Sequence, residues 1–171
     1  QPFRIRDRNC SRVARVVNSN GSVERLNSSL RSHGNKLLEF YEEMASTGYM
    51  RADGVEVENA YDDFELRKFR KFVQPKFEES GIKTVLDYGA GGSDWAAAGF
   101  DQETGLSAQE YFNVENVKIF EPARGFSKKE SADGVVCCDV LEHIFLPDIP
   151  TVVRELFSLC KKLLVVNVAC Y

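Results

Sequence analysis

Apolar residues recur at helical spacing in the first half of the chain. Residues 35–44 place Leu37, Leu38, Tyr41 and Met44 on one face of a helix. This pattern predicts a helix over those residues.

A second helix is predicted for residues 61–73, after a polar, glycine-containing loop that runs through Asn59. Asp62 and Asp63 stand at its start, where the helix dipole favours acidic side chains. We expect Pro75 to end or kink this helix, because proline removes a backbone hydrogen bond. The apolar residues of the segment are Phe64, Leu66, Phe69, Phe72 and Val73.

Short runs of β-branched and apolar residues predict strands in the second half of the chain. These runs cover residues 84–88, 117–120, 134–138 and 163–169. Between the last two, residues 149–160 carry one apolar face at the 3.6-residue period, which predicts a helix. Strands that alternate with helices imply an α/β fold with a doubly wound, mostly parallel sheet. The ligand of such a sheet belongs at the carboxyl ends of the strands.

The helix predicted for residues 149–160 has recognisable start signals. Pro147 and Pro150 mark its entry, and Asp148 is the candidate N-cap. A side-chain oxygen at that position can accept a hydrogen bond from an N–H of the first helical turn.

The 171 residues are enough for about one domain. We expect residues 1–34 to form a flexible or partly helical arm, because they are rich in Arg, Asn and Ser without a sustained period. We expect residues 35–171 to form the α/β domain, with a helical lead-in at 35–83 and the ligand-binding core at 84–171. The chain begins without an initiator Met and stops directly after an apolar run, so we expect it to be part of a longer protein.

Composition and charge exclude several classes of protein. With 43% apolar residues and 12 Phe, the chain has ample core material, so general disorder is excluded. The 22 basic and 26 acidic residues give a net charge of −4 without a long basic run, so nucleic acid is not the expected partner. Because the chain has neither a bilayer-length apolar stretch nor a signal-peptide segment, we expect a cytoplasmic protein without a membrane partner.

The five cysteines are Cys10, Cys137, Cys138, Cys160 and Cys170. Their number is odd and they form no CxxC pair, which favours reduced thiols buried as small hydrophobic side chains over a metal or redox site. Because Cys137 and Cys138 are neighbours on a predicted strand, their side chains should point to opposite faces of the sheet.

The sharpest local signal is the run VLDYGAGGS at residues 85–93. Glycines just past a strand can adopt positive φ and let the backbone approach a ligand closely, and the free amides of the turn can bind polar or anionic groups. In a second interpretation the same glycines only turn the chain from a strand into a helix.

Acidic residues follow the next two predicted strands. Glu121 comes directly after residues 117–120, where a nucleotide-binding sheet accepts hydrogen bonds from ribose hydroxyls. A solvated surface glutamate is the alternative. The run DVLEHI at residues 139–144 follows the next strand and places two acids and His143 where strand ends converge. For His143 alone, a hydrogen-bonded histidine at a helix start is the alternative to a catalytic one.

Together, the runs VLDYGAGGS, VKIFEPA and ADGVVCCDVLEHI resemble the first, second and fourth strand motifs of class I S-adenosylmethionine-dependent methyltransferases. DVLEHI after an apolar strand is similar to the small-molecule branch of that superfamily. The longer strings LDYGAGGSDW, EPAR, DVLEHIFLPDIP and VVNVACY also resemble a bacterial and phage-associated subgroup. The resemblance covers residues 84–171 well, residues 35–83 loosely and residues 1–34 not at all.

This resemblance implies a Rossmann-like methyltransferase sheet, S-adenosyl-L-methionine as the cofactor and a small molecule as the methyl acceptor. Asp87, Gly89, Ala90 and Gly91 would form the loop under the methionine half of the cofactor. Glu121 would hold the ribose.

On the same resemblance, Asp139 and Val140 would lie beside the sulfonium end of the cofactor. If the acceptor is a hydroxyl or a protonated amine, a base must take its proton, and His143 and Glu142 are the candidates. The transfer itself needs no covalent intermediate.

The chain departs from the family pattern in two places. Asp133 comes only 12 positions after Glu121, which is too short for a crossover helix and a third strand. We therefore expect the third strand to be reduced or absent, and we assign no adenine contact. The family sheet also continues with two further strands that shape the acceptor pocket, and this chain stops at Tyr171.

Two alternative functions are less favoured. A nicotinamide-dependent oxidoreductase would place a third glycine where this chain has Asp94, and its acid would follow Gly89 by about 20 residues, whereas Glu121 follows it by 32. A degenerate methyltransferase fold that binds a cofactor or partner without turnover is the second alternative, because a fold does not fix a function.

Overall fold

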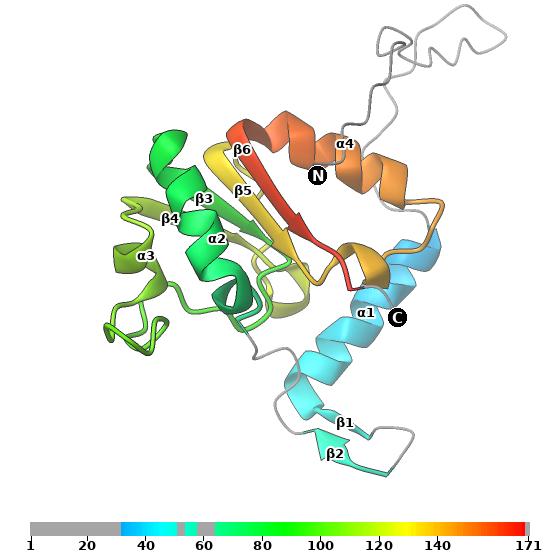
Figure 1. Cartoon of the computed structure of the whole chain (residues 1–171). Coiled ribbons are helices and arrows are strands. Elements are labelled where there is room, and N and C mark those ends of the chain that lie inside the picture. Colours follow the sequence, from blue (N-terminus) through cyan, green and yellow to red (C-terminus); the bar gives the residue numbers. More distant parts are fainter. Residues whose placement is uncertain (1–31, 51–53, 58–63, 170–171) are drawn as a thin grey trace, which may run out of the picture.

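The computed structural model of this protein describes residues 32–50, 54–57 and 64–169 (Figure 1). Most of the predicted arm at 1–34 and the predicted helix start at Asp62 and Asp63 lie outside these residues. The elements are, in chain order, α1 (Ser32–Thr47), β1 (Tyr49–Met50), β2 (Glu56–Val57), α2 (Leu66–Glu79), β3 (Thr84–Tyr88), α3 (Ala108–Tyr111), β4 (Asn116–Phe120), η1 (Pro122–Arg124), β5 (Ala132–Cys138), η2 (Leu141–His143), α4 (Ile149–Leu159) and β6 (Cys160–Asn167).

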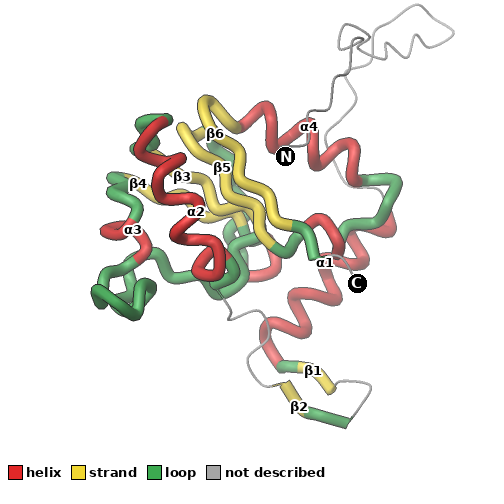
Figure 2. Tube along the Cα trace, in the orientation of Figure 1, coloured by secondary structure: helices red, strands yellow, loops and turns green. Residues whose placement is uncertain are grey.

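In the described residues one parallel sheet has the strand order β4-β3-β5-β6 (Figure 2). Leu86 on the central strand β3 lies opposite Lys118 on β4 and Val135 on β5. The predicted mixed α/β fold with a parallel sheet is confirmed. The strands β1 and β2 pair antiparallel with each other; the sequence pattern predicted a loop there, because two residues are too short to carry a period of two.

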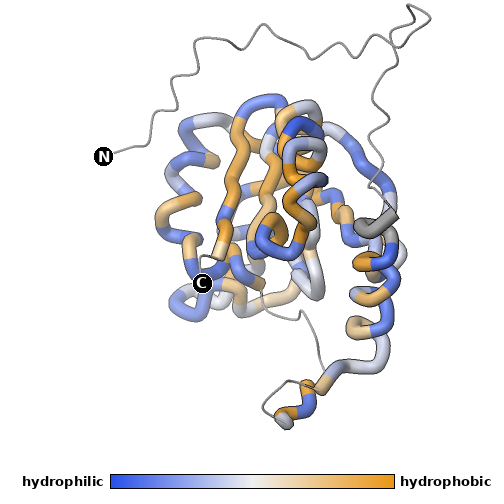
Figure 3. The backbone as a smooth tube through the Cα atoms, turned by 90° about the vertical axis from the view of Figure 1, so that its right-hand side faces the viewer, coloured by the Kyte–Doolittle hydropathy of each residue, from blue (hydrophilic) through white to orange (hydrophobic). Residues whose placement is uncertain are grey.

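Helices cover both faces of the sheet. Val73 and Phe77 of α2 belong to a core with Val85 and Val136 on one face, whereas α4 belongs to a second core on the other face. That second core includes Leu86, Val135, Cys137, Val152 and Leu156. Figure 3 shows hydrophobic residues concentrated along the strands, between the two layers of helix. Successive side chains of a strand point to opposite faces, so a sheet buried on both faces requires apolar residues at consecutive positions.

The helix α2 runs through Pro75 and continues to Glu79, so, of the two expectations for Pro75, that it ends or kinks the helix, the first is wrong. The missing N–H of proline costs a helix about 3 kcal/mol. The buried side chains of Val73 and Phe77 lie on either side of Pro75 and are 3% and 1% exposed. Their burial outweighs the local cost, because each contributes roughly 1.5 to 3 kcal/mol.

Two predictions around α4 need correction. Asp148 holds the N-cap position but makes no capping hydrogen bond through its side chain, because its backbone is already helical at φ −96° and ψ −19°. The last strand begins at Cys160 rather than Leu163, since Cys160 is extended and pairs with Ala132. Lys161 and Lys162, which precede the predicted strand, are exposed side chains on β6.

The chain passes from β4 to β5 through residues 121–131, all of which are described, with only the short helix η1 between them. This segment crosses β3, because β3 lies between β4 and β5 in the sheet. The third strand that a longer crossover would supply does not occur in this segment, in agreement with the spacing of Glu121 and Asp133.

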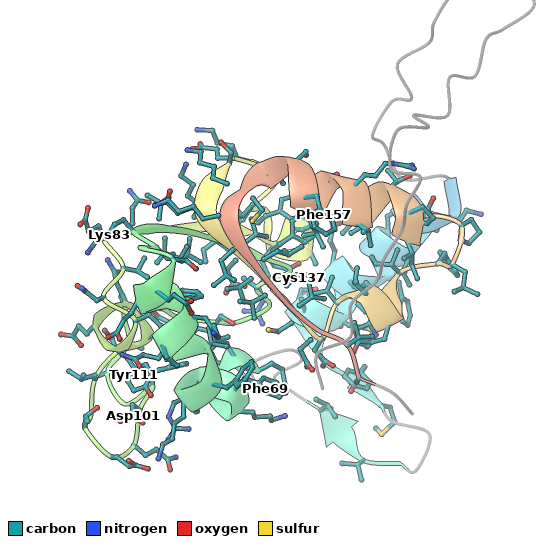
Figure 4. The ribbon with its side chains drawn as sticks, turned by 45° about the horizontal axis from the view of Figure 1, so that its top comes forward. Phe69, Lys83, Asp101, Tyr111, Cys137 and Phe157 are labelled. Carbon is teal, nitrogen blue, oxygen red and sulfur yellow. The ribbon has the colours of Figure 1, made fainter. Side chains whose placement is uncertain are left out.

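Cys137 lies in the interior of the molecule (Figure 4) and is buried in the core on the α4 side, while Cys138 packs against the core on the α2 side. The predicted opposite orientation of these neighbours is confirmed. The thiols of Cys137, Cys138 and Cys160 are free, and burial raises the pKa of the Cys138 thiol to about 12. Cys10 and Cys170 lie outside the described residues.

None of the helices in the described residues combines the length and the apolarity needed to cross a membrane.

Candidate functional site

The strand order brings three loops from different parts of the chain to one edge of the sheet. The glycine turn follows β3, Glu121 follows β4, and residues 139–143 follow β5. Because β3 lies between β4 and β5 and all three are parallel, their carboxyl ends lie side by side. This edge contains every candidate residue that the sequence motifs suggested.

The glycine turn has the backbone geometry that its composition predicts. Gly89 has a φ of 76° and Gly91 a φ of 54°, a region that favours glycine. A Cβ built on Gly89 would lie 2.4 Å from Cγ2 of Val140. The absence of a side chain at Gly89 therefore makes room for Val140.

The amides of the turn are largely used within the protein. Gly89 N–H donates to the carbonyl of Phe120 at 2.7 Å, and Ser93 N–H donates to the carbonyl of Ala90 at 2.9 Å. Gly91 N–H donates to Oε2 of Glu121 at 2.8 Å. The expected set of free, anion-binding amides is accordingly reduced, and the carboxylate of Glu121 occupies the place of an anion.

Glu121 links the turn to the loop after β4. Its Oε1 accepts a hydrogen bond from Ala123 N–H at 3.2 Å, and its Oε2 accepts the one from Gly91. The side chain is half-buried, so it is not the solvated surface glutamate of the alternative interpretation. Each carboxylate oxygen has room for a further hydrogen bond, because an ionised carboxylate offers about four acceptor positions.

Asp87 is 4% exposed and lies beneath the glycine turn. Its pKa is raised to about 7, mainly by burial and also by the nearby charge of Glu121, while a hydrogen bond from Trp95 acts in the opposite direction. In that bond the indole N–H of Trp95 donates to Oδ2 of Asp87 at 2.7 Å. Asp87 thus supports the turn from below. The sequence motifs did not indicate a role for Trp95, although this residue closes the string LDYGAGGSDW.

The loop after β5 places two carboxyl groups together. Asp139 has a φ of 58°, a backbone conformation that residues other than glycine rarely adopt. Burial raises the pKa of Asp139, and a hydrogen bond with Glu142 raises it further. Burial acts in the same direction on Glu142, but hydrogen bonds from its own amide, from Ala169 N–H and from Asp139 outweigh it and lower its pKa. Two carboxyl groups can share a hydrogen bond only through a proton, so Asp139 and Glu142 titrate as a pair.

Glu142 is held from two sides. Its Oε1 accepts a short hydrogen bond from Ala169 N–H, just beyond the end of β6. Its Oε2 is buried without an N–H or O–H donor in the described part of the chain. A buried oxygen of this kind calls for a proton or a further hydrogen-bond donor.

His143 ends the short helix η2 and lies next to a residue that the motifs did not include. Its ring packs edge-on against Tyr41 of α1, with the ring centroids 6.0 Å apart. Burial and the charge of Glu142 raise the pKa of Tyr41. The sequence predicted the helix that carries Tyr41, but periodicity alone does not say where a helix docks.

In the described residues, neither a metal-binding cluster nor a groove adds to the candidate site at this edge. The described residues contain no cluster of three His, Cys, Asp or Glu side chains that could hold a metal ion. A groove of about 300 Å³ lies between α2 and β6 and is lined by Phe69 (labelled in Figure 4), Phe72 and Val166 among others, but by none of the candidate residues.

Comparisons with protein-family models, with curated proteins and with solved structures found no match.

Proposed function

We propose that this chain binds S-adenosylmethionine and transfers its methyl group to a small-molecule acceptor. The observation that carries the proposal is the hydrogen bond between Gly91 N–H and Glu121, 2.8 Å long. It joins the glycine turn of one strand to the strand-end acid of the next. Val140 packs against Gly89 from the other side, so the three motifs form one continuous surface.

The residues on this surface fit the cofactor. Glu121 keeps an acceptor position on each oxygen beyond its bonds to Gly91 and Ala123. A carboxylate at the end of the second strand is the group that accepts ribose hydroxyls in nucleotide-binding sheets. Asp139 and Val140, across the turn from Glu121, would lie toward the sulfonium.

When bound, S-adenosylmethionine supplies an activated methyl group that an acceptor displaces in line from sulfur. The task of the chain is to orient the acceptor toward that methyl group, because alignment of two reactants can contribute several kcal/mol. His143, Asp139 and Glu142 line the same loop. A base works best with a pKa near the working pH, so the raised pKa of Asp139 suits proton removal better than the lowered pKa of Glu142.

The oxidoreductase alternative loses support from the geometry. Pyrophosphate binding in that fold uses the N-terminus of a helix that opens at the glycine turn. Here the residues from Ala90 to Ser107 are turns and loops, and the next helix, α3, has four residues from Ala108.

A non-catalytic binding module is the second candidate function. One observation favours it: the amides of Gly89 and Gly91 bond to the protein itself, which leaves few donors to hold a cofactor for reaction. This alternative predicts weak binding of the cofactor, or binding of a partner, without formation of S-adenosylhomocysteine in a screen of acceptors.

Titration calorimetry with S-adenosylmethionine, S-adenosylhomocysteine and NADH tests the proposal. We expect saturable binding of the first two ligands and none of NADH. Fluorescence of Trp95, the single tryptophan of the chain, gives an independent signal because Trp95 bonds to Asp87 below the turn. Binding of NADH alone at millimolar concentration would replace the proposal with the oxidoreductase.

A further inference from the structure

The helix α1 contacts two strand-end loops that are not neighbours in the sheet. It packs against η1, which directly follows Glu121. Through Tyr41 it also contacts His143, in the loop after β5. The two loops belong to β4 and β5, and β3 lies between those strands. A straight helix that reaches both loops must therefore pass over the end of β3, where the glycine turn lies.

The picture of the fold agrees with this placement. In Figure 1, α1 lies beyond the tips of the strand arrows, at the carboxyl edge of the sheet, whereas α2 and α4 lie along its faces. The helix thus covers an edge rather than a face.

The face that α1 turns toward the protein is apolar but incompletely covered. Tyr41 and its neighbours on that face are half-buried, and none of the described side chains of α1 is fully buried. They also belong to neither of the two cores. The residues of this face are Leu37, Leu38, Tyr41, Met44 and Ala45. An apolar stripe of this kind has surface left for a further contact.

We propose that α1 forms the roof of the ligand site, and that the ring of Tyr41 positions His143 beneath it. This inference rests on the proposed function and names the occupant: the nucleoside cofactor lies between the glycine turn and the apolar face of α1. The roof gives the cofactor an apolar contact. Tyr41 is a positioning residue, because it acts through the ring of His143.

Hydrogen exchange of the full chain, with and without S-adenosylhomocysteine, tests the roof. We expect the ligand to slow exchange of the amides in residues 36–47 together with those of the glycine turn. The helix α4 serves as the internal control, because it lies on a face of the sheet, and its exchange should change little.

Three variants test the ring of Tyr41. We expect Tyr41→Ala to weaken S-adenosylhomocysteine binding at least fivefold, whereas Tyr41→Phe keeps the ring and binds within twofold of the wild type. The matched control is Phe40→Ala, one residue away on α1, where the side chain is 56% exposed; it should also bind within twofold. Circular dichroism of each variant establishes that the chain is folded.

The outcomes separate the two proposals. If the wild type does not bind the ligand, the proposed function fails and the roof fails with it. If it binds while residues 36–47 exchange as before and Tyr41→Ala binds normally, only the roof is overturned. Equal losses in Tyr41→Ala and Tyr41→Phe would refute positioning by the ring, and equal losses in Tyr41→Ala and Phe40→Ala would show only a loss of helix.

Discussion

Gly91 N–H donates a hydrogen bond to the carboxylate of Glu121 across 30 positions of sequence. The bond is possible because β3 and β4 are parallel neighbours, which puts the residues after Tyr88 beside those after Phe120. Glu121 therefore has a structural role whatever it binds. It fixes the glycine turn and the start of η1 relative to each other.

Removal of this carboxylate should affect stability as well as binding. We expect Glu121→Ala to lower the free energy of unfolding by about 1.5 to 3 kcal/mol, the usual contribution of a hydrogen bond to a charged group, and to weaken S-adenosylhomocysteine binding. Glu121→Gln keeps one acceptor oxygen and should lose less of both. Urea denaturation and calorimetry measure the two effects.

The control for this change is Glu115→Ala, since that side chain is 70% exposed and only 3.5 Å from Lys83 in a surface ion pair. Such pairs contribute little. Unfolding curves of Glu121→Ala and Glu115→Ala that coincide would show that the bond to Gly91 contributes nothing measurable.

Gly89→Ala should lower the free energy of unfolding more than Gly125→Ala does, although both glycines have a positive φ, 76° and 83°. The Gly89 Cβ would clash with Val140, whereas the Gly125 Cβ would meet no atom within 4 Å. We expect Gly125→Ala to destabilise by about 1 kcal/mol, the backbone term alone. Gly89→Ala adds an overpacking term of typically 1 to 3 kcal/mol.

The double variant Gly89→Ala/Val140→Ala separates the two terms. Removal of the valine methyl groups should recover part of the loss at Gly89, which a double-mutant cycle of thermal unfolding measures as a coupling. Strict additivity would contradict the packing of Val140 on Gly89.

The sequence predicted those parts of the fold that depend on local period and those parts of the site that depend on strand ends. The helix face with Tyr41, the strand 84–88 and the parallel sheet follow from spacing alone, and parallel strands bring Glu121 to the glycine turn. Two features needed knowledge of packing: the passage of α2 through Pro75, and the contact of Tyr41 with His143. Both depend on contacts between residues that are far apart in the sequence.

The pH dependence of stability should report Asp87. Its pKa is about 7 in the folded protein against an ordinary 3.8, so the folded state holds a proton that the unfolded state releases between about pH 4 and 7. The free energy of unfolding therefore falls as the pH rises through that window. The full effect is on the order of 4 kcal/mol.

Asp87→Asn removes this titration and keeps an oxygen that can accept from Trp95. We expect its unfolding free energy, followed by circular dichroism, to depend less on pH between 4 and 7 than that of the wild type. Trp95 fluorescence in the folded wild type should titrate around pH 7, the pKa of Asp87 in the folded protein. An identical pH slope in both proteins would place the proton elsewhere.

We expect Asp139 to lower the free energy of unfolding, because its position at the site is unfavourable for an aspartate. Its φ of 58° is unfavourable for a residue with a side chain, and its raised pKa means that the folded protein disfavours the ionised carboxylate. Strained residues of this kind cluster at functional sites. Asp139→Gly removes the strain and the charge, so we expect it to be more stable than the wild type by about 1 kcal/mol. Asp139→Asn removes the charge while asparagine tolerates positive φ, and Asp139→Ala removes the charge but keeps the strain. The expected order of stability, from highest to lowest, is therefore glycine, asparagine, alanine. An alanine variant as stable as the glycine variant would mean that the backbone at this position is not strained.

The same three variants test the role of Asp139 in catalysis. All three should form less S-adenosylhomocysteine in an acceptor screen if Asp139 takes the proton of the acceptor.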